Sequence, residues 1–175
     1  MYFDNFDNGR KPYSITIAKG NDTDPLKLVK SLKKEIIKND LDLSNGDMAF
    51  CKFDTDEDSN KNKLINEANK YALQNGIRMI ISSPCIELWF LLHYDYTTAR
   101  LSNDEVIKRL KQYYPKYDKN INIYKEINEN VDEAIKRAKK LENYQIENGK
   151  IIGTTDANPS TEMYKIVEYL NIMSK

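Results

Sequence analysis

The chain has 175 residues, which is the size of one ordinary domain. Apolar residues make up 40% of the sequence and charged residues 31%, a balance that excludes both wholesale disorder and a membrane-embedded protein. Lys plus Arg and Asp plus Glu each number 27, so the net charge does not favour nonspecific binding to polyanions. Residues 1–11 lack the apolar stretch of a signal peptide, and Cys51 and Cys85 lack metal-site spacing. We therefore expect a cytoplasmic protein with two buried thiols.

The first half of the chain alternates between strand and helix patterns. Tyr, Ile and Thr at 13–18 suit a strand, and the apolar runs at 48–53 and 77–81 predict two more. Between them lie helical patterns at 24–37, which opens with an Asp-Pro start signal, and at about 60–74. This alternation predicts an α/β fold with a parallel sheet and right-handed crossovers.

The second half is predicted to be mostly helical. Residues 146–155 read as an irregular connection around two glycines. No linker separates the halves, so we expect a single domain over 1–175, with its α/β core at about 13–95 and its helical part at about 96–175. The expected helices span 86–94, 102–113 (opened by a capping box), 121–143 and a last segment that begins at Asn158-Pro159.

Two carboxylates stand where the second expected strand ends. Asp54 and Asp56 are two residues apart, so in an extended chain they point the same way, about 6.6 Å apart at the backbone. Oxygen ligands of this kind suit Mg²⁺, and ligands gather at the carboxyl ends of strands in open α/β sheets. A solvated acidic turn is the alternative for such a pair.

The strand at 77–81 leads into an apolar segment that carries one acid, Glu87. A glutamate buried beside Trp89 and Phe90 needs a cation, hydrogen bonds or a proton, and a metal at the two aspartates would serve; capping of its own helix is the alternative. His93 is the single histidine, and we expect it to be packed and hydrogen-bonded rather than a metal ligand.

The third candidate region precedes the last expected helix. Asn158, Ser160 and Thr161 carry groups that cap helices, and a helix N-terminus with free N–H groups and hydroxyls also receives phosphate. Capping and phosphate binding are therefore both open for these three residues.

Taken in order, these segments resemble the RloB family, whose members are encoded beside prokaryotic restriction and phage-defence loci. The block from Pro84 to His93 and the terminal N-P-S-T are the most specific parts of the resemblance, which covers nearly the whole chain. The matching stretches are Lys19-Gly20, 25–29, 53–57, 82–93, Tyr117-Asp118-Lys119, 134–139 and 158–161.

The resemblance implies a TOPRIM-like fold, in which Mg²⁺ (or Mn²⁺) is held by a D-x-D pair and a glutamate that follows the first strand. In the family, this glutamate lies in a segment like E-G-x-x-T-E-x-x-Y-F. Here Met1-Tyr2-Phe3 resembles the end of that segment, and the strand and its glutamate are not in this sequence: either the sequence is truncated at its start, or this member lacks a metal ligand and part of its sheet. Asp4, Asp7 and Glu87 are the candidate substitutes.

The leading hypothesis is a Mg²⁺-dependent, nuclease-like defence effector that cleaves phosphodiester bonds in nucleic acid. Asp54 and Asp56 would hold the metal, Glu57 or Glu87 would orient water, and Lys119 would contact phosphate. The alternative is a non-catalytic sensor or partner of a defence-associated ATPase, and a D-x-D nucleotide-sugar transferase is a third reading with little room for its substrate. Loss of the first strand would leave a sheet edge, so we also expect that the protein self-associates or needs a partner, and that its nuclease activity alone is weak or nil.

Overall fold

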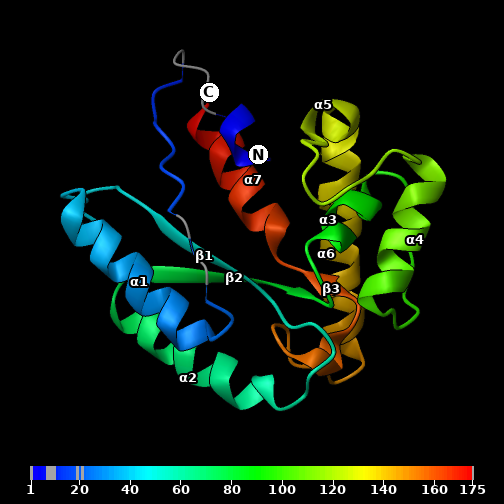
Figure 1. The fold of residues 1–175 in the computed structure, drawn as a ribbon, viewed down its shortest axis with the longest axis horizontal. Coiled ribbons are helices and arrows are strands. Elements are labelled where there is room, and N and C mark those ends of the chain that lie inside the picture. The colour runs from blue at the N-terminus through cyan, green and yellow to red at the C-terminus, as the bar shows by residue number, and fades with distance from the viewer. Residues whose placement is uncertain (1, 7–10, 19, 21, 175) are drawn as a thin grey trace.

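The computed structural model describes the whole chain except residues 1, 7–10, 19, 21 and 175 (Figure 1). The first half holds a 3₁₀ turn and two strand–helix alternations: η1 (Phe3–Asn5), α1 (Pro25–Lys38), β1 (Ala49–Asp54), α2 (Lys61–Gln74) and β2 (Ile77–Ser83). The second half is mostly helical: α3 (Glu87–Leu92), α4 (Asn103–Tyr113), α5 (Tyr124–Ile127), η2 (Asn128–Asn130), α6 (Val131–Glu147), η3 (Thr155–Ala157), β3 (Ser160–Thr161) and α7 (Met163–Met173).

The described sheet is small and mixed, in the order β1-β2-β3. β1 and β2 are adjacent and parallel, with Asp54 and Ser82 at the same edge, as the sequence predicted. Their register pairs Ala49 with Ile77 and Asp54 with Ser82. The short β3 lies antiparallel to β2. The fold class is therefore α/β as expected, with the difference that the third strand comes from the C-terminal part of the chain.

Residues 13–18 were expected to form a strand, and this prediction is wrong. Tyr13 and Ile15 pack against the larger apolar core, while Ile17 is 52% exposed. The alternating pattern thus indicated correctly that Tyr13 and Ile15 face the core, where both are half-buried. Strand propensity reflects packing context more than an intrinsic backbone preference, so it did not decide the conformation here.

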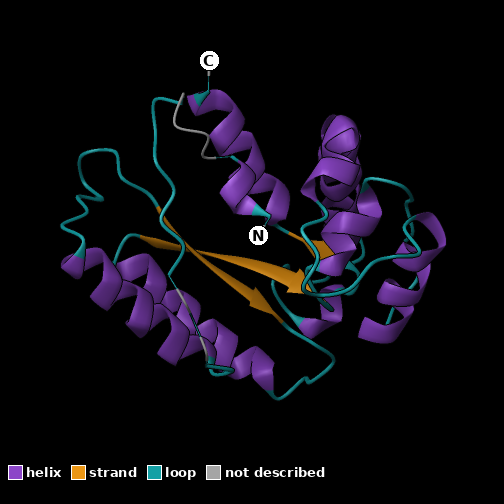
Figure 2. Ribbon diagram, turned by 45° about the horizontal axis from the view of Figure 1, so that its top comes forward, coloured by secondary structure: helices purple, strands orange, loops and turns teal. Residues whose placement is uncertain are grey.

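Helices α1 and α2 cover one face of the strands, and Figure 2 shows them side by side beneath the sheet. Asp24 caps α1 by accepting a hydrogen bond from the Lys27 N–H at 2.8 Å. Buried residues of both helices, among them Val29 and Ala68, pack with inward-facing residues of the strands such as Cys51 and Ile81. Helix α2 therefore returns the chain from the end of β1 to the start of β2, which is why the two strands end at one edge.

The helical half has its own core around α3. Trp89, Leu88 and Leu91 are fully enclosed and pack with residues of α4, α6 and α7. The expected helix at 121–143 is broken at η2, where Asn128, Glu129 and Asn130 offer the core no apolar side chain, and α6 continues to Glu147. Both predicted thiols are free and buried.

The last helix begins at Met163 and not at Asn158-Pro159 as expected. Asn158 has an extended backbone, and its side chain bonds the backbone of Leu101 in both directions. Thr161 in β3 shares a hydrogen bond with Ser82 in β2, with 2.8 Å between the hydroxyl oxygens. Pairing with β2 and with the segment before α4 thus holds residues 158–161 extended and delays the helix.

Within the described residues, every helix is too short or too polar to cross a bilayer.

Candidate functional site at the carboxyl ends of the strands

The site begins where the two parallel strands end. Beyond β1 the pairing continues, because the Thr55 N–H donates to Ser82 O and the Asp56 N–H donates to Pro84 O, each at 2.9 Å. The Thr55 hydroxyl donates to Ser83 Oγ at 3.0 Å in a buried position. The predicted meeting of the two segments at one sheet edge is therefore confirmed, and the backbone that carries the two aspartates is held on one side by the next strand.

Asp54 lies at the last position of β1 and is coupled to a lysine and a glutamate. Its Oδ2 accepts a hydrogen bond from Lys52 Nζ at 2.9 Å. Its Oδ1 is buried and has no hydrogen bond of normal geometry among the described residues. Burial raises the pKa of Asp54 and the charge of Glu87 raises it further, against the opposing effects of Lys52 and the Ile86 N–H. Asp54 is thus a carboxylate with one oxygen left to bind a cation.

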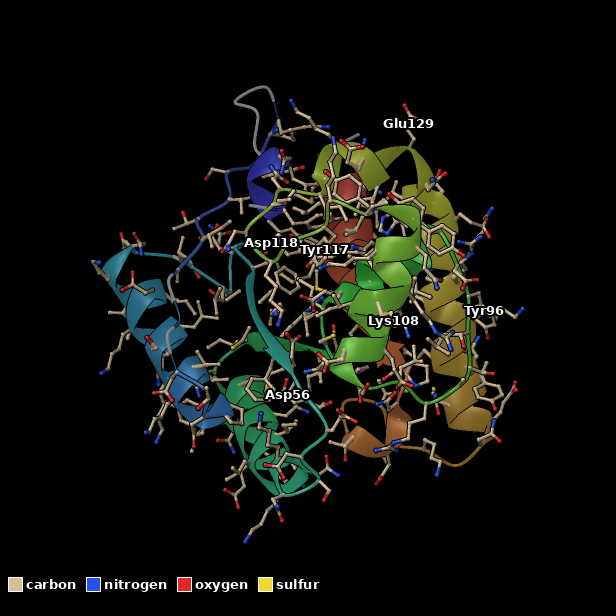
Figure 3. The ribbon with its side chains drawn as sticks, turned by 45° about the vertical axis from the view of Figure 1, so that its right-hand side comes forward. Asp56, Tyr96, Lys108, Tyr117, Asp118 and Glu129 are labelled. Carbon is tan, nitrogen blue, oxygen red and sulfur yellow. The ribbon has the colours of Figure 1, made fainter. Side chains whose placement is uncertain are left out.

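Asp56 occupies the turn after β1, in a left-handed backbone conformation with φ of 51°. Its Oδ2 accepts from Lys61 Nζ, at the start of α2, and its Oδ1 accepts from Asn103 Nδ2, at the start of α4, at 3.0 Å. Figure 3 shows Asp56 beyond the strand end, between these two helices. Partial burial alone would raise the pKa of Asp56, but the bonds from Lys61 and Asn103 and the charge of Lys119 together lower it. Asp56 is therefore held ionised.

Glu87 is buried, at 5% exposure, as the sequence predicted. The Tyr117 hydroxyl donates to its Oε1 at 3.1 Å. Burial, followed by the charge of Glu87, raises the pKa of this tyrosine, so the hydroxyl keeps its proton and stays a donor. The electrostatic coupling of Glu87 with Asp54 places both acids in one region of the site.

The remaining predicted site residues lie at the rim or in the interior. Glu57 and Lys119 are exposed, and the charge of Lys119 reaches Asp56. Ser160 and Thr161 are 2% and 1% exposed and lie in β3, while Asn158 is 6% exposed and bonded to Leu101. These three residues do not form a helix N-terminus, because α7 starts after them, and phosphate binding by them stays a prediction.

The other sequence predictions around the site have mixed outcomes. His93 is packed and hydrogen-bonded as expected, with Nδ1 2.9 Å from Trp89 O. Asp7 lies outside the described residues, and the side chain of Asp4 is likewise not described. Phe3–Asn5 form a 3₁₀ turn, and Tyr2 packs against Phe90 in the aromatic cluster of the helical half.

Three residues that sequence reasoning did not select belong to the site. Lys61 and Asn103 hold Asp56, and Tyr117 holds Glu87. Asn103 lies inside the predicted capping box and Lys61 at a predicted helix start, so their positions at helix starts were the available signal. The residue after Lys61, Asn62, exchanges two hydrogen bonds with Thr155, at 3.0 and 2.9 Å.

The oxygen atoms that face this edge come from few acids. In the part of the chain that the structure describes, no group of three or more His, Cys, Asp or Glu side chains has the arrangement of a metal site. Asp54 and Asp56 supply hard carboxylate oxygens, and each also contacts a lysine. Such a donor set fits a cation like Mg²⁺ that keeps several of its own waters, rather than one enclosed by protein ligands.

Comparison with models of protein families matches residues 1–170 to the family described as RloB-like protein. No curated protein and no solved structure matches the chain.

Proposed function

The chain belongs to the RloB-like family, and from this premise we propose that it is a Mg²⁺-dependent, nuclease-like effector of prokaryotic phage defence that cleaves phosphodiester bonds. The observation that carries the proposal is the strand edge itself. β1, which pairs in parallel with β2, ends with Asp54 and leads into Asp56 at this edge, and a lysine contacts each aspartate. Enzymes that cleave phosphodiester bonds commonly combine carboxylates that bind a metal ion with nearby ammonium groups that bind the phosphate.

The metal would be held by Asp54 and Asp56. The Oδ1 of Asp54 is buried and has no hydrogen bond of normal geometry among the described residues, and a bound cation would satisfy such an oxygen. When bound, Mg²⁺ would polarise the phosphate and lower the pKa of an attacking water. Because one expected carboxylate is absent from the sequence, we expect weak binding.

The other residues have supporting roles in the proposal. Glu87 raises the pKa of Asp54 and so favours a cation in its vicinity, and the Tyr117 hydroxyl holds Glu87 in place. Lys119, exposed and near Asp56, is placed to contact a phosphate that approaches from solvent. Glu57, also exposed, is the candidate to orient water.

Metal binding tests the proposal first. Calorimetric titration of the protein with Mg²⁺ or Mn²⁺ should show binding that is lost in Asp54→Ala and in Asp56→Ala. Asp58→Ala is the matched control, because Asp58 is an exposed acid in the same segment whose contacts are with Asn60. Equal binding by the wild-type protein and the Asp54→Ala variant would contradict the assignment.

Cleavage assays test the activity. Plasmid, single-stranded DNA and tRNA incubated with the protein and Mg²⁺ should show slow cleavage that stops with a chelator and in the Asp56→Ala variant. The substrate that is cut identifies DNA or RNA as the target. Cleavage that persists in Asp56→Ala would contradict the proposed role of this site.

A second candidate function is a non-catalytic partner or sensor of a defence-associated ATPase. The observation that favours it is that Lys52 and Lys61 already neutralise the two aspartates, as in a purely structural ion-pair network. The two functions differ in cells: the Asp54→Ala and Asp56→Ala variants should lose phage protection if the protein is a nuclease, and keep it if the protein is a scaffold.

A further inference from the structure

The carboxylate of Asp56 is joined directly to the helical half of the molecule. Asn103 Nδ2 donates to Asp56 Oδ1 over 3.0 Å, across 47 positions of sequence. Lys61 Nζ donates to the other oxygen, Oδ2. The two donors to this carboxylate therefore come from two different helices, α2 and α4. The rotation of this side chain is thereby set by α2 and α4, while its backbone N–H is bonded to Pro84 O.

Asn103 is itself held in place at the first position of α4. Ser102 forms a reciprocal capping box with Glu105, so the start of this helix has a defined geometry. Val106 and Leu110 anchor the same helix in the core, both at 0% exposure. The Oδ1 of Asn103 is buried and has no hydrogen-bond partner within the described residues, so the Asp56 bond is the side-chain contact that defines its rotamer.

The segment that leads into Asn103 is bound to the C-terminal part of the chain. Asn158 Oδ1 accepts from the Leu101 N–H at 3.1 Å, and Asn158 Nδ2 donates to Leu101 O at 2.8 Å. Both residues are buried, at 6% and 2% exposure. This two-way bond acts like a strand pairing between a side chain and a backbone, and it sets the position from which α4 starts.

We propose that Asn103 is a positioning residue that orients Asp56 for its cation, and that Asn158 fixes the segment that presents Asn103. The inference rests on the proposed function, in which Asp56 is a metal ligand. It gives the helical half a role at the strand edge: Asn158, Leu101 and Asn103 form a continuous connection that ends on the Asp56 carboxylate. An oriented carboxylate binds a cation more tightly than a freely rotating one, because it loses less side-chain entropy when the cation binds.

The first test measures the contact without metal. In a ¹⁵N-labelled protein, the side-chain amide signal of Asn103 should move on Asp56→Ala and stay in place on Asp58→Ala. If the chemical shift of the Asn103 side-chain amide does not change in Asp56→Ala, the inference is overturned, whether or not the protein is a nuclease.

The second test measures the consequence. Asn103→Ala should weaken Mg²⁺ binding several-fold by calorimetry, with the melting temperature nearly unchanged, because alanine is well tolerated at an early helix position. Asn148→Ala is the matched control, since Asn148 lies at the end of α6 and bonds Tyr144 O. Asn158→Ala should reproduce part of the loss, and the double variant with Asn103→Ala should bind no more weakly than Asn103→Ala alone.

The outcomes separate the inference from the proposed function. Mg²⁺ affinity that is unchanged in Asn103→Ala but lost in Asp56→Ala would leave the function standing and overturn the positioning role. Additive losses in the double variant would overturn the connection through Asn158. A wild-type protein that binds no Mg²⁺ would refute both the proposed metal site and the positioning role, even if the amide signal confirmed the contact.

Discussion

The Tyr117 hydroxyl donates a hydrogen bond to Glu87 Oε1 at 3.1 Å, which joins a loop of the helical half to the acid at the start of α3 across 30 positions of sequence. Both residues are buried, at 5% exposure each. The bond explains how a glutamate survives in an apolar helix, because a buried carboxylate needs a donor.

Tyr117→Phe should therefore destabilise the fold. The ring and its contact with Phe90 remain, while Glu87 loses the Tyr117 hydroxyl as a donor, so we expect a loss of about 1–3 kcal/mol in the free energy of unfolding. Urea denaturation measures it. Tyr113→Phe, at an exposed tyrosine, is the control. In a Glu87→Gln background the effect of Tyr117→Phe should shrink, and an equal loss in both backgrounds would refute this account of the bond.

Asp54→Asn should separate stability from metal binding. A carboxyl whose pKa is raised on folding holds its proton more tightly in the native state, so its ionisation lowers the free energy of unfolding as pH rises through and above the unfolded value. Removing this charge should raise the melting temperature at pH 7, with a smaller gain near pH 3, while Mg²⁺ binding is lost. The lost pair with Lys52, which is 37% exposed, contributes little. A lower melting temperature at pH 7 would contradict the proposed cause.

Lys61→Met should tighten Mg²⁺ binding. The Lys61 ammonium contacts Asp56 Oδ2, so a cation must displace it or share the oxygen. Methionine keeps much of the side-chain length and its packing near the Phe53 ring, and removes the competing charge. Calorimetry should show a several-fold gain in affinity relative to the wild type. The control is Lys63→Met, at an exposed lysine of the same helix, and a gain of equal size there would indicate a general charge effect.

His93 should make the fold sensitive to mild acid. Burial lowers the pKa of His93 from 6.5 to about 4, against the raising effect of the Trp89 and Phe90 backbones. The unfolded chain therefore binds the proton first, so the stability present above pH 6.5 is lost progressively as pH falls towards 4. Between pH 7 and 5 this amounts to about 2 kcal/mol.

His93→Gln measures the contribution. Its free energy of unfolding should fall less between pH 7 and 5 than that of the wild-type protein, whatever the difference between the two at pH 7. Parallel pH profiles for the two proteins would show that folding leaves the pKa of His93 unchanged, and would contradict this prediction.

The sequence by itself determined the elements whose signals are local. The Asp24-Pro25 start, the Ser102–Glu105 capping box and the apolar run of β2 are each encoded within a few neighbouring residues. Because parallel strands joined by helices end at one edge, the meeting of Asp54 with Ser82 also followed from the order of the elements. The burial of Glu87 followed in the same way from its apolar neighbours.

Only the tertiary structure decided which side chains meet across elements. Asn103 reaches Asp56 from 47 positions away and Asn158 reaches Leu101 from 57, and neither pair leaves a periodic trace in the sequence. The same holds for residues 13–18 and 158–161, where the choice between strand, helix and extended chain depended on the available partner rather than on propensity. Local patterns record what one segment can bury, whereas the polar contacts that orient a site form only after distant segments have packed against each other.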